Sequence, residues 1–284
     1  MHTDDVERDE IVAGVRRLFD LVADSYDAVG VTLFEPIATG LVEAVGASPG
    51  DRAVDLGCGN GVSSRALAAA VGPTGSVVGL DLSPAMVERA AAALDGSPTE
   101  VTFVVGDAQD PDLSPASFDA AIASLVVFFL PDAAGAVSRW LRLLRPGGRL
   151  GISTFGPSSP QWQALEAPLR EFMPPTDPRM AGPQSPFGSD GGMEALVTGA
   201  GAVDVQTSSR RVEFAFDDVD HWVRFSRSVG QRIAWERMTD DQRAGVLERS
   251  RATFAEVAGP DGSLPVWQQV RYTVGRAPGD PSRS

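Results

Sequence analysis

The stretch VDLGCGNG, residues Val54–Gly61, decides the fold of this chain. A short apolar run carries an acid near its end, three alternating glycines follow, and a helical pattern begins directly afterwards. Glycines at such a strand-to-helix turn let the backbone approach a ligand closely, and the helix N-terminus offers free amide donors. The segment therefore predicts a ligand-binding loop between the first strand and the first helix of an α/β sheet.

The residues after this loop continue to alternate between strand and helix patterns. Ser83-Pro84 opens one helix with a favoured cap and a proline at its first position, and Arg145-Pro146-Gly147-Gly148 stops another. Repeated units of this length predict a Rossmann-like, mostly parallel sheet with helices on both faces. The expected strands are Ala53–Leu56, Val77–Leu80, Val101–Val105, Ala120–Ser124, Arg149–Thr154, Val203–Phe216 and Gln268–Val274.

Helical patterns outside this core lie at both ends of the chain. Apolar residues at helical spacing predict helices at about 8–27 and Phe34–Val45, and two further helices at about 217–238 and 239–258. The Pro-rich segment 173–187 is a candidate lid or a plain surface loop. We therefore expect a single domain over 1–284. Its expected parts are N-terminal helices (1–47), a cofactor core (48–216), a helical cap inserted before the last strand (217–262) and the final strand (263–277).

Composition excludes several classes of function. The net charge of −14 argues against nucleic acids and anionic membranes as partners, because phosphates need a basic face. No signal segment or apolar run of roughly 18 residues is present, so we expect a cytoplasmic protein without a membrane span. One cysteine, two histidines and no lysine leave neither a Cys/His metal cluster nor a Schiff-base lysine. No metal site is expected, and a homodimer stays open.

Three acids stand at the ends of three successive predicted strands. Asp55 precedes the glycines, Asp81 lies 20 residues after Gly61, and Asp107 follows the third strand. In a Rossmann arrangement the acid at the second strand end accepts hydrogen bonds from ribose hydroxyls. Val62 occupies the position where a dinucleotide fingerprint needs glycine, so a nicotinamide cofactor is disfavoured. The spacing favours a nucleoside cofactor without a pyrophosphate.

These motifs resemble class I S-adenosylmethionine-dependent methyltransferases of the ubiquinone and menaquinone biosynthesis type (methyltransferase type 11), which include many natural-product and antibiotic tailoring enzymes. The resemblance runs from Phe19 to Gly148, about half of the chain. It implies S-adenosyl-L-methionine as the cofactor, a small-molecule acceptor, and an antiparallel last strand at the sheet edge. The implied cofactor-binding residues are Tyr26, Asp55, Gly57, Gly59, Gly61, Asp81, Leu82, Met86, Asp107, Ala108 and Ser124.

The acceptor site has to be predicted from the cap alone. On a helix through 217–238, one stripe carries His221, Phe225, Ser228, Arg232 and Trp235. If the cap covers the cofactor, this stripe lines the acceptor pocket. His221 is then the candidate base for a hydroxyl acceptor, and Arg232 the candidate partner of a carboxylate acceptor.

Phe128, Phe129, Phe155 and Trp162 are further candidates for the pocket wall, with packing in the core as the alternative for each. The most favoured function is methyl transfer to oxygen of a small, largely apolar molecule in secondary metabolism. A cofactor-binding protein of the same fold that catalyses a non-methylating cyclisation or elimination is the alternative, because its cofactor motifs would look the same.

Overall fold

The computed structural model describes residues 3–174 and 185–279. Its centre is a seven-stranded sheet in the order β3-β2-β1-β4-β5-β7-β6. The first five strands are parallel, and β7 runs antiparallel to both of its neighbours. The strands are β1 (Arg52–Leu56), β2 (Ser76–Asp81), β3 (Glu100–Val105), β4 (Phe118–Ser124), β5 (Leu144–Ser158), β6 (Val203–Phe216) and β7 (Leu264–Arg276).

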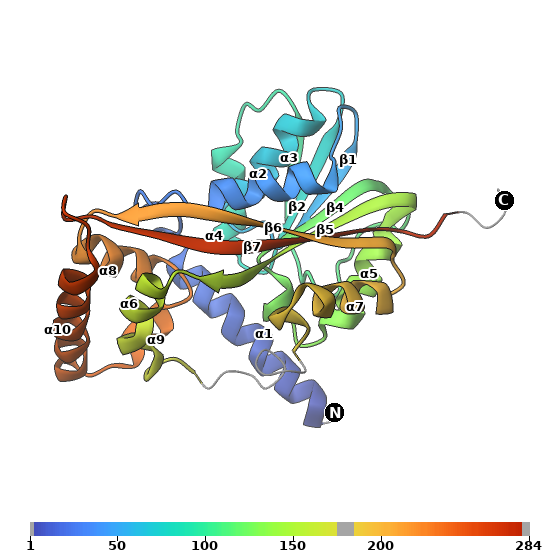
Figure 1. The fold of residues 1–284 in the computed structure, drawn as a ribbon. Coiled ribbons are helices and arrows are strands. Elements are labelled where there is room, and N and C mark those ends of the chain that lie inside the picture. The colour runs from blue at the N-terminus through green and yellow to red at the C-terminus, as the bar shows by residue number, and fades with distance from the viewer. Residues whose placement is uncertain (1–2, 175–184, 280–284) are drawn as a thin grey trace.

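Helices cover both faces of the sheet, as Figure 1 shows, and the Rossmann-like fold expected from the sequence is confirmed. Buried side chains of α2 and α3 belong to one core cluster, and those of α5 and α7 to a second. The helices are α1 (Thr3–Val22), α2 (Phe34–Val45), α3 (Val62–Val71), α4 (Pro84–Ala93), α5 (Ala133–Leu143), α6 (Pro160–Arg170), α7 (Asp190–Gly199), α8 (Val219–Ser228), α9 (Arg232–Arg237) and α10 (Asp240–Val257), with short 3-10 turns η1 (Val127–Phe129) and η2 (Pro186–Gly188).

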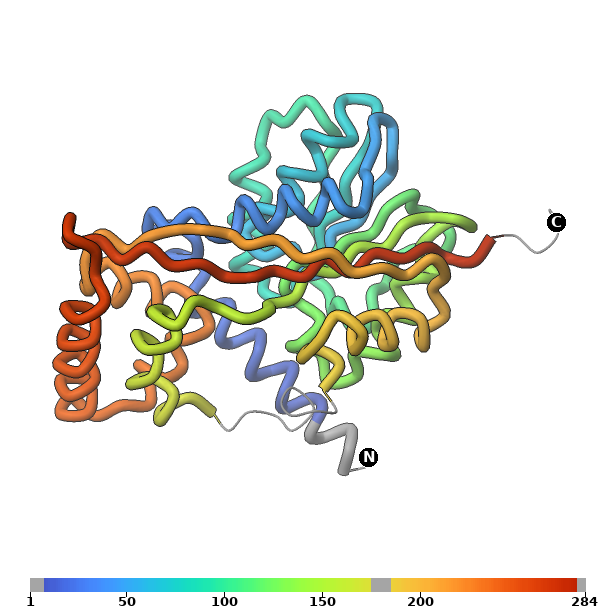
Figure 2. Tube along the Cα trace, viewed as in Figure 1, coloured from blue at the N-terminus to red at the C-terminus, as the bar shows by residue number. Residues whose placement is uncertain are grey.

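Strands β6 and β7 form a long antiparallel ribbon that continues beyond the parallel part of the sheet. Figures 1 and 2 show the two strands side by side along their whole length, with α6, α8, α9 and α10 gathered around their far end. Helices α8, α9 and α10 enter the chain between β6 and β7. Their aromatic side chains, among them Trp222, Phe225 and Trp235, pack into the same core cluster as those of β6.

The structure corrects four expectations. The last strand, β7, lies between β5 and β6, so β6 and not β7 is the edge strand. The helix expected over 217–238 is two helices, because Gly230, a weak helix former, stands in the break after Ser228. The first helix ends at Val22 and not near 27, and Asp27 has a left-handed φ of 56°. Helix α7 was not predicted.

Candidate functional site

The functional site forms where the carboxyl ends of the parallel strands meet. Strands β1 and β2 run in register from Arg52 opposite Ser76 to Leu56 opposite Leu80. Beyond their ends, the backbone amides of Gly57 and Cys58 both donate to the Leu80 carbonyl, at 2.7 and 2.9 Å. These bonds fix the glycine loop against the second strand, which brings residues from separate motifs to one edge of the sheet.

Two glycines of the loop are required for different reasons. Gly57 and Gly59 have φ values of +77° and +53°, in the left-handed region that favours glycine. A Cβ on Gly57 would lie 2.5 Å from Val126 Cγ2, so the loop has no room for a side chain there. Around Gly59 no atom lies within 4 Å of that position, and the space belongs to a cavity. A side chain at Gly59 would fill the place of a ligand.

Asp81 joins the end of β2 to this loop. Its Oδ2 accepts a hydrogen bond from the Gly59 amide at 2.8 Å, and its Oδ1 accepts one from the Ser83 amide at 2.9 Å. Burial raises the pKa of Asp81, and these backbone hydrogen bonds act against the rise. The carboxyl therefore lines the cavity in a fixed orientation, as expected for a group that binds ribose hydroxyls.

Most of the expected cofactor residues surround this one cavity, which we call the cofactor cavity. Phe19, from α1, and Phe129, from η1, form further parts of its wall, and their rings meet edge to face at 5.3 Å. The expected residues that line it are Tyr26, Gly57, Gly59, Asp81, Leu82, Asp107, Ala108 and Ser124.

Three expected cofactor residues lie behind the cavity wall instead. Gly61 caps α3, where a Cβ would meet Ala90 at 3.1 Å. Met86 is fully buried in a cluster with Val22 of α1. Asp55 is also fully buried; its Oδ2 accepts a 2.7 Å hydrogen bond from Ser64 Oγ. These residues support the shape of the site from behind.

Asp55 has an unusually high pKa for an aspartate. Burial raises its pKa to about 7, the Ser64 hydrogen bond lowers it, and the nearby Asp81 carboxylate raises it further. Its Oδ1 has no hydrogen-bond partner among the described residues. Because Asp55 lines neither cavity, a bound water beneath the glycine loop is the donor that fits this buried oxygen.

Tyr26 forms a wall between the cofactor cavity and a second, larger cavity. Its ring stacks on Phe34 with centroids 5.1 Å apart, and Nδ2 of the Asn60 side chain donates to its backbone carbonyl at 3.3 Å. Burial raises the pKa of Tyr26, so its hydroxyl stays protonated. Phe19, Leu125 and Phe129 also line both cavities. The two spaces therefore adjoin each other along these shared residues.

The second cavity, which we call the acceptor cavity, has a volume of about 490 Å³. The aromatic residues that the sequence offered for a pocket wall, Phe128, Phe129, Phe155 and Trp162, all line it, as does Phe225 of α8. Most of the Pro-rich segment 173–187 lies outside the described residues, and its residues Met173 and Pro174 line the cavity. The cavity is therefore bounded by α1, the start of α2, α6, the segment from α8 to α9, the ends of β4 and β5, and β7.

His221 and Arg232, the two catalytic candidates, do not line this cavity. The His221 ring is buried, its Nδ1 accepts from the Asp217 amide at 3.2 Å, and its Nε2 lies 2.9 Å from the Val29 carbonyl. Arg232 lies in α9 beyond the helix break; its Nε pairs with Glu236 and its Nη1 donates to the Leu21 carbonyl. The single stripe that placed both in the pocket required an unbroken helix.

Sequence reasoning missed the polar residues of the acceptor cavity. Glu166, Gln231 and Gln268 line it among the aromatic side chains. Glu166 follows Trp162 by four residues, so the two share one face of α6. This four-residue spacing is the sequence signal that could have placed Glu166 in the cavity wall. Gln231 could not be found in this way because it lies in the break between α8 and α9.

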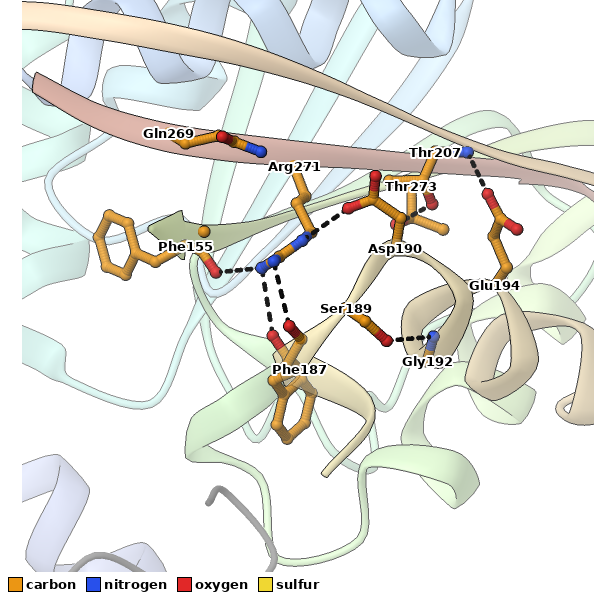
Figure 3. Close-up of polar contacts among 12 residues, drawn as sticks. Phe155, Phe187, Ser189, Asp190, Gly192, Glu194, Thr207, Gln269, Arg271 and Thr273 are labelled. Carbon is orange, nitrogen blue, oxygen red and sulfur yellow. Dashed lines mark hydrogen bonds and ion pairs between the residues drawn. The ribbon is translucent and has the colours of Figure 1, made fainter. Parts of the chain in front are cut away.

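The sequence analysis also did not identify Arg271, which holds backbone segments next to the cavity wall in place. Figure 3 shows its guanidinium directed at η2, the start of α7 and the end of β5. Its Nη1 donates to the carbonyls of Phe155 and Phe187 at 2.7 and 3.2 Å. The rings of both residues contact Phe128, at centroid distances of 6.0 and 6.4 Å. One buried arginine thus holds two aromatic segments around a third.

Fold and site together define a Rossmann-like protein with a candidate nucleoside site and an adjoining, largely apolar cavity. A methyltransferase domain model matches residues 53–148. The chain is 34% identical to nocamycin O-methyltransferase from Saccharothrix syringae, over 91% of its own length and 97% of that protein. It therefore belongs to the class I S-adenosylmethionine-dependent methyltransferases.

Two more proteins extend this relationship. Aklanonic acid methyltransferase DauC from Streptomyces sp. (strain C5) is 36% identical over 57% of this chain and 70% of its own. The crystal structure of the [4+2]-cyclase SpnF superimposes with a TM-score of 0.57 at 16% identity, over 94% of this chain and 96% of its own. The second likeness shows the fold alone.

Neither a metal site nor a membrane-spanning helix is found in the described part of the chain. No group of three or more His, Cys, Asp or Glu side chains there is arranged to hold a metal ion. Within the same residues, every helix is too short or too polar to cross a bilayer.

Proposed function

We propose that this enzyme transfers the methyl group of S-adenosylmethionine to an oxygen atom of a small, largely apolar molecule of secondary metabolism. The observation that carries the proposal is the pair of adjoining cavities, one lined by the nucleoside-binding acids and the other by aromatic side chains. Nocamycin O-methyltransferase, which matches 91% of this chain, is an O-methyltransferase, and this supports oxygen as the methylated atom.

The residues of the cofactor cavity fit this cofactor. Asp81 offers a fixed carboxylate for the ribose hydroxyls, and Asp107 at the end of β3 offers an acceptor for the adenine amine. Gly59 leaves open space where a side chain would stand. When bound, S-adenosylmethionine supplies an electrophilic methyl group on a sulfonium sulfur.

The chain contributes position and exclusion of water to such a reaction. Tyr26, Phe19 and Phe129 line both cavities with aromatic surface, so the cofactor and the acceptor would lie next to the same residues. Holding an acceptor in line with the breaking bond and removing water are the main requirements for a displacement at carbon. The domain limits given above, with residues 217–262 as a cap, are part of this proposal.

Calorimetric titration with S-adenosylhomocysteine tests the cofactor site. We expect micromolar binding to the wild-type protein and binding weakened by roughly tenfold or more in Asp81→Ala, because hydrogen bonds to a charged group contribute about 1.5–3 kcal/mol. Asp112→Ala, which removes an exposed acid near Asp107, is the matched control. Equal affinity in Asp81→Ala and the wild type would contradict the assignment.

Mass spectrometry of reactions with hydroxylated aromatic compounds tests the chemistry. A product heavier by one methylene unit, formed only with S-adenosylmethionine, supports methyl transfer. A product of unchanged mass from a consumed substrate would instead favour cofactor-assisted cyclisation, the alternative reaction; the methyltransferase relatives disfavour that outcome.

A further inference from the structure

The acceptor cavity holds a carboxyl group within an aromatic wall. Glu166 on α6 is half-buried beside Trp162, and its Oε1 accepts a hydrogen bond from Gln231 Nε2. Burial raises the pKa of Glu166, while hydrogen bonds from the side chains of Trp162 and Gln231 and the charge of Arg170 lower it. The pair joins α6 to the break between α8 and α9, so the two parts of the wall meet at a polar contact.

Gln231 orients the Glu166 carboxyl in this wall. Its Nε2 faces the Glu166 carboxyl, and its Oε1 is buried without a hydrogen-bond partner among the described residues. A buried carbonyl oxygen without a donor costs about 1–3 kcal/mol. Because this oxygen is shielded from the cavity, the Glu166 carboxyl is the acceptor of this pair that a hydroxyl group on a bound molecule can use. The polar contact is therefore built to accept hydrogen bonds rather than to donate them.

The charged residues around the cavity also favour an uncharged acceptor over a carboxylate. Among its described lining residues there is no arginine and no histidine. Arg232, the nearby candidate for binding a carboxylate, is directed instead to Glu236 and to the Leu21 carbonyl. A carboxylate in the cavity would lie near the Glu166 carboxyl in apolar surroundings, where like charges repel strongly.

We propose that Glu166 and Gln231 determine which acceptors bind, selecting uncharged aromatic molecules that carry a hydroxyl group and rejecting carboxylates. Rings such as Phe128 and Phe155 supply apolar walls for a flat acceptor, and the Glu166–Gln231 pair orients it through its hydroxyl. The proposal rests on the proposed function in treating this cavity as the acceptor site. Its consequences for binding do not require methyl transfer.

Binding of 2-naphthol and 2-naphthoate at neutral pH tests the selection, because the two probes share a ring system and differ in charge. By calorimetry, we expect the wild-type protein to bind 2-naphthol at least about tenfold more tightly than 2-naphthoate. In Glu166→Gln the gap should shrink to about threefold or less through stronger 2-naphthoate binding. Gln231→Leu should weaken 2-naphthol binding, because it removes the hydrogen bond that orients the Glu166 carboxyl.

Glu171→Gln is the matched control, since Glu171 follows α6, is exposed and pairs with Arg249 outside the cavity. It should leave both affinities unchanged. The proposal is overturned if the wild type binds neither probe, if it binds both equally, or if a folded Glu166→Gln keeps the original ratio. Should Glu166→Gln not fold, unchanged 2-naphthol binding in Gln231→Leu overturns it. Titration with S-adenosylhomocysteine runs in parallel, and its failure would count against the proposed function alone.

Discussion

Nε of Arg271 lies 2.7 Å from Oδ1 of Asp190, so an ion pair joins β7 to the first residue of α7. The arginine side chain is 8% exposed and the aspartate side chain 53% exposed. The same guanidinium donates to three backbone carbonyls, those of Phe155, Phe187 and Gly188. Its donors therefore have protein partners on three separate segments, and the aromatic residues beside the acceptor cavity depend on it.

Arg271→Met should destabilise the protein strongly, because methionine fills similar space but leaves the three carbonyls and Asp190 without their donor. We expect a loss of about 2–4 kcal/mol in the free energy of unfolding, measured by urea denaturation. Arg276→Met on the same strand is the control: its Nη1 donates to the Gly147 carbonyl at an exposed position, and its loss should stay under about 1 kcal/mol. Equal losses in both variants would contradict the role given to Arg271.

Replacing glycine by alanine should have opposite effects on stability at Gly40 and at Gly245, although both residues lie in helices. A Cβ on Gly40 of α2 would lie 2.5 Å from the Tyr272 hydroxyl, whereas nothing lies within 4 Å of that position at Gly245 of α10. Gly40→Ala should therefore destabilise by about 1–3 kcal/mol through overpacking. Gly245→Ala should stabilise by about 0.5–1 kcal/mol, because alanine is the better helix former. Thermal unfolding checks both, and a stabilised Gly40→Ala would show that β7 yields easily.

The cofactor site could be predicted from the sequence because its signals are local. The glycine loop, Asp81 and Asp107 each follow a strand, and parallel strands in register bring such positions together without further information. Asp55 shows the limit of that reasoning. Its place in the motif was clear, but only the packing of α3 reveals that it is fully buried against Ser64.

The acceptor side could not be predicted, because it depends on contacts between distant segments. One weak helix former, Gly230, divides the cap helix, moves Arg232 out of the expected stripe and places Gln231 beside Glu166. Helical periodicity does not register a break of this kind when apolar residues continue on both sides. The edge position given to β7 came from the family resemblance and was wrong, because β7 pairs with both β5 and β6.

His221 provides a test of the difference between a catalytic and a structural histidine. Its ring bridges the Asp217 amide and the Val29 carbonyl, so His221→Ala removes two partly buried hydrogen bonds. We expect a loss of about 1–3 kcal/mol in the free energy of unfolding. Affinities for S-adenosylhomocysteine and 2-naphthol should change by less than about twofold at a temperature where the variant is folded. A stable variant that loses methyl transfer would restore the catalytic role expected from the sequence.

Asp55 should make the stability of the ligand-free protein fall as the pH rises. Its carboxyl has an ordinary pKa of 3.8 in the unfolded chain and a pKa of about 7 in the folded one, so the folded state binds more protons between these values. The stabilising contribution is complete below about pH 4 and is lost as the pH rises through about 7.

The asparagine in Asp55→Asn cannot ionise. We therefore expect this variant to lose much less stability than the wild type as the pH rises. The shift corresponds to roughly 4 kcal/mol at most, because one pKa unit is 1.36 kcal/mol. Urea denaturation at pH 5 and pH 8 measures the part of this loss between the two pH values, which is about 2–3 kcal/mol for the wild type. Asp27→Asn is the comparison: burial raises the pKa of Asp27 to about 6, so its part of the loss should be complete at a lower pH. If Asp55→Asn keeps the full pH dependence of the wild type, the buried carboxyl beneath the glycine loop is not its source.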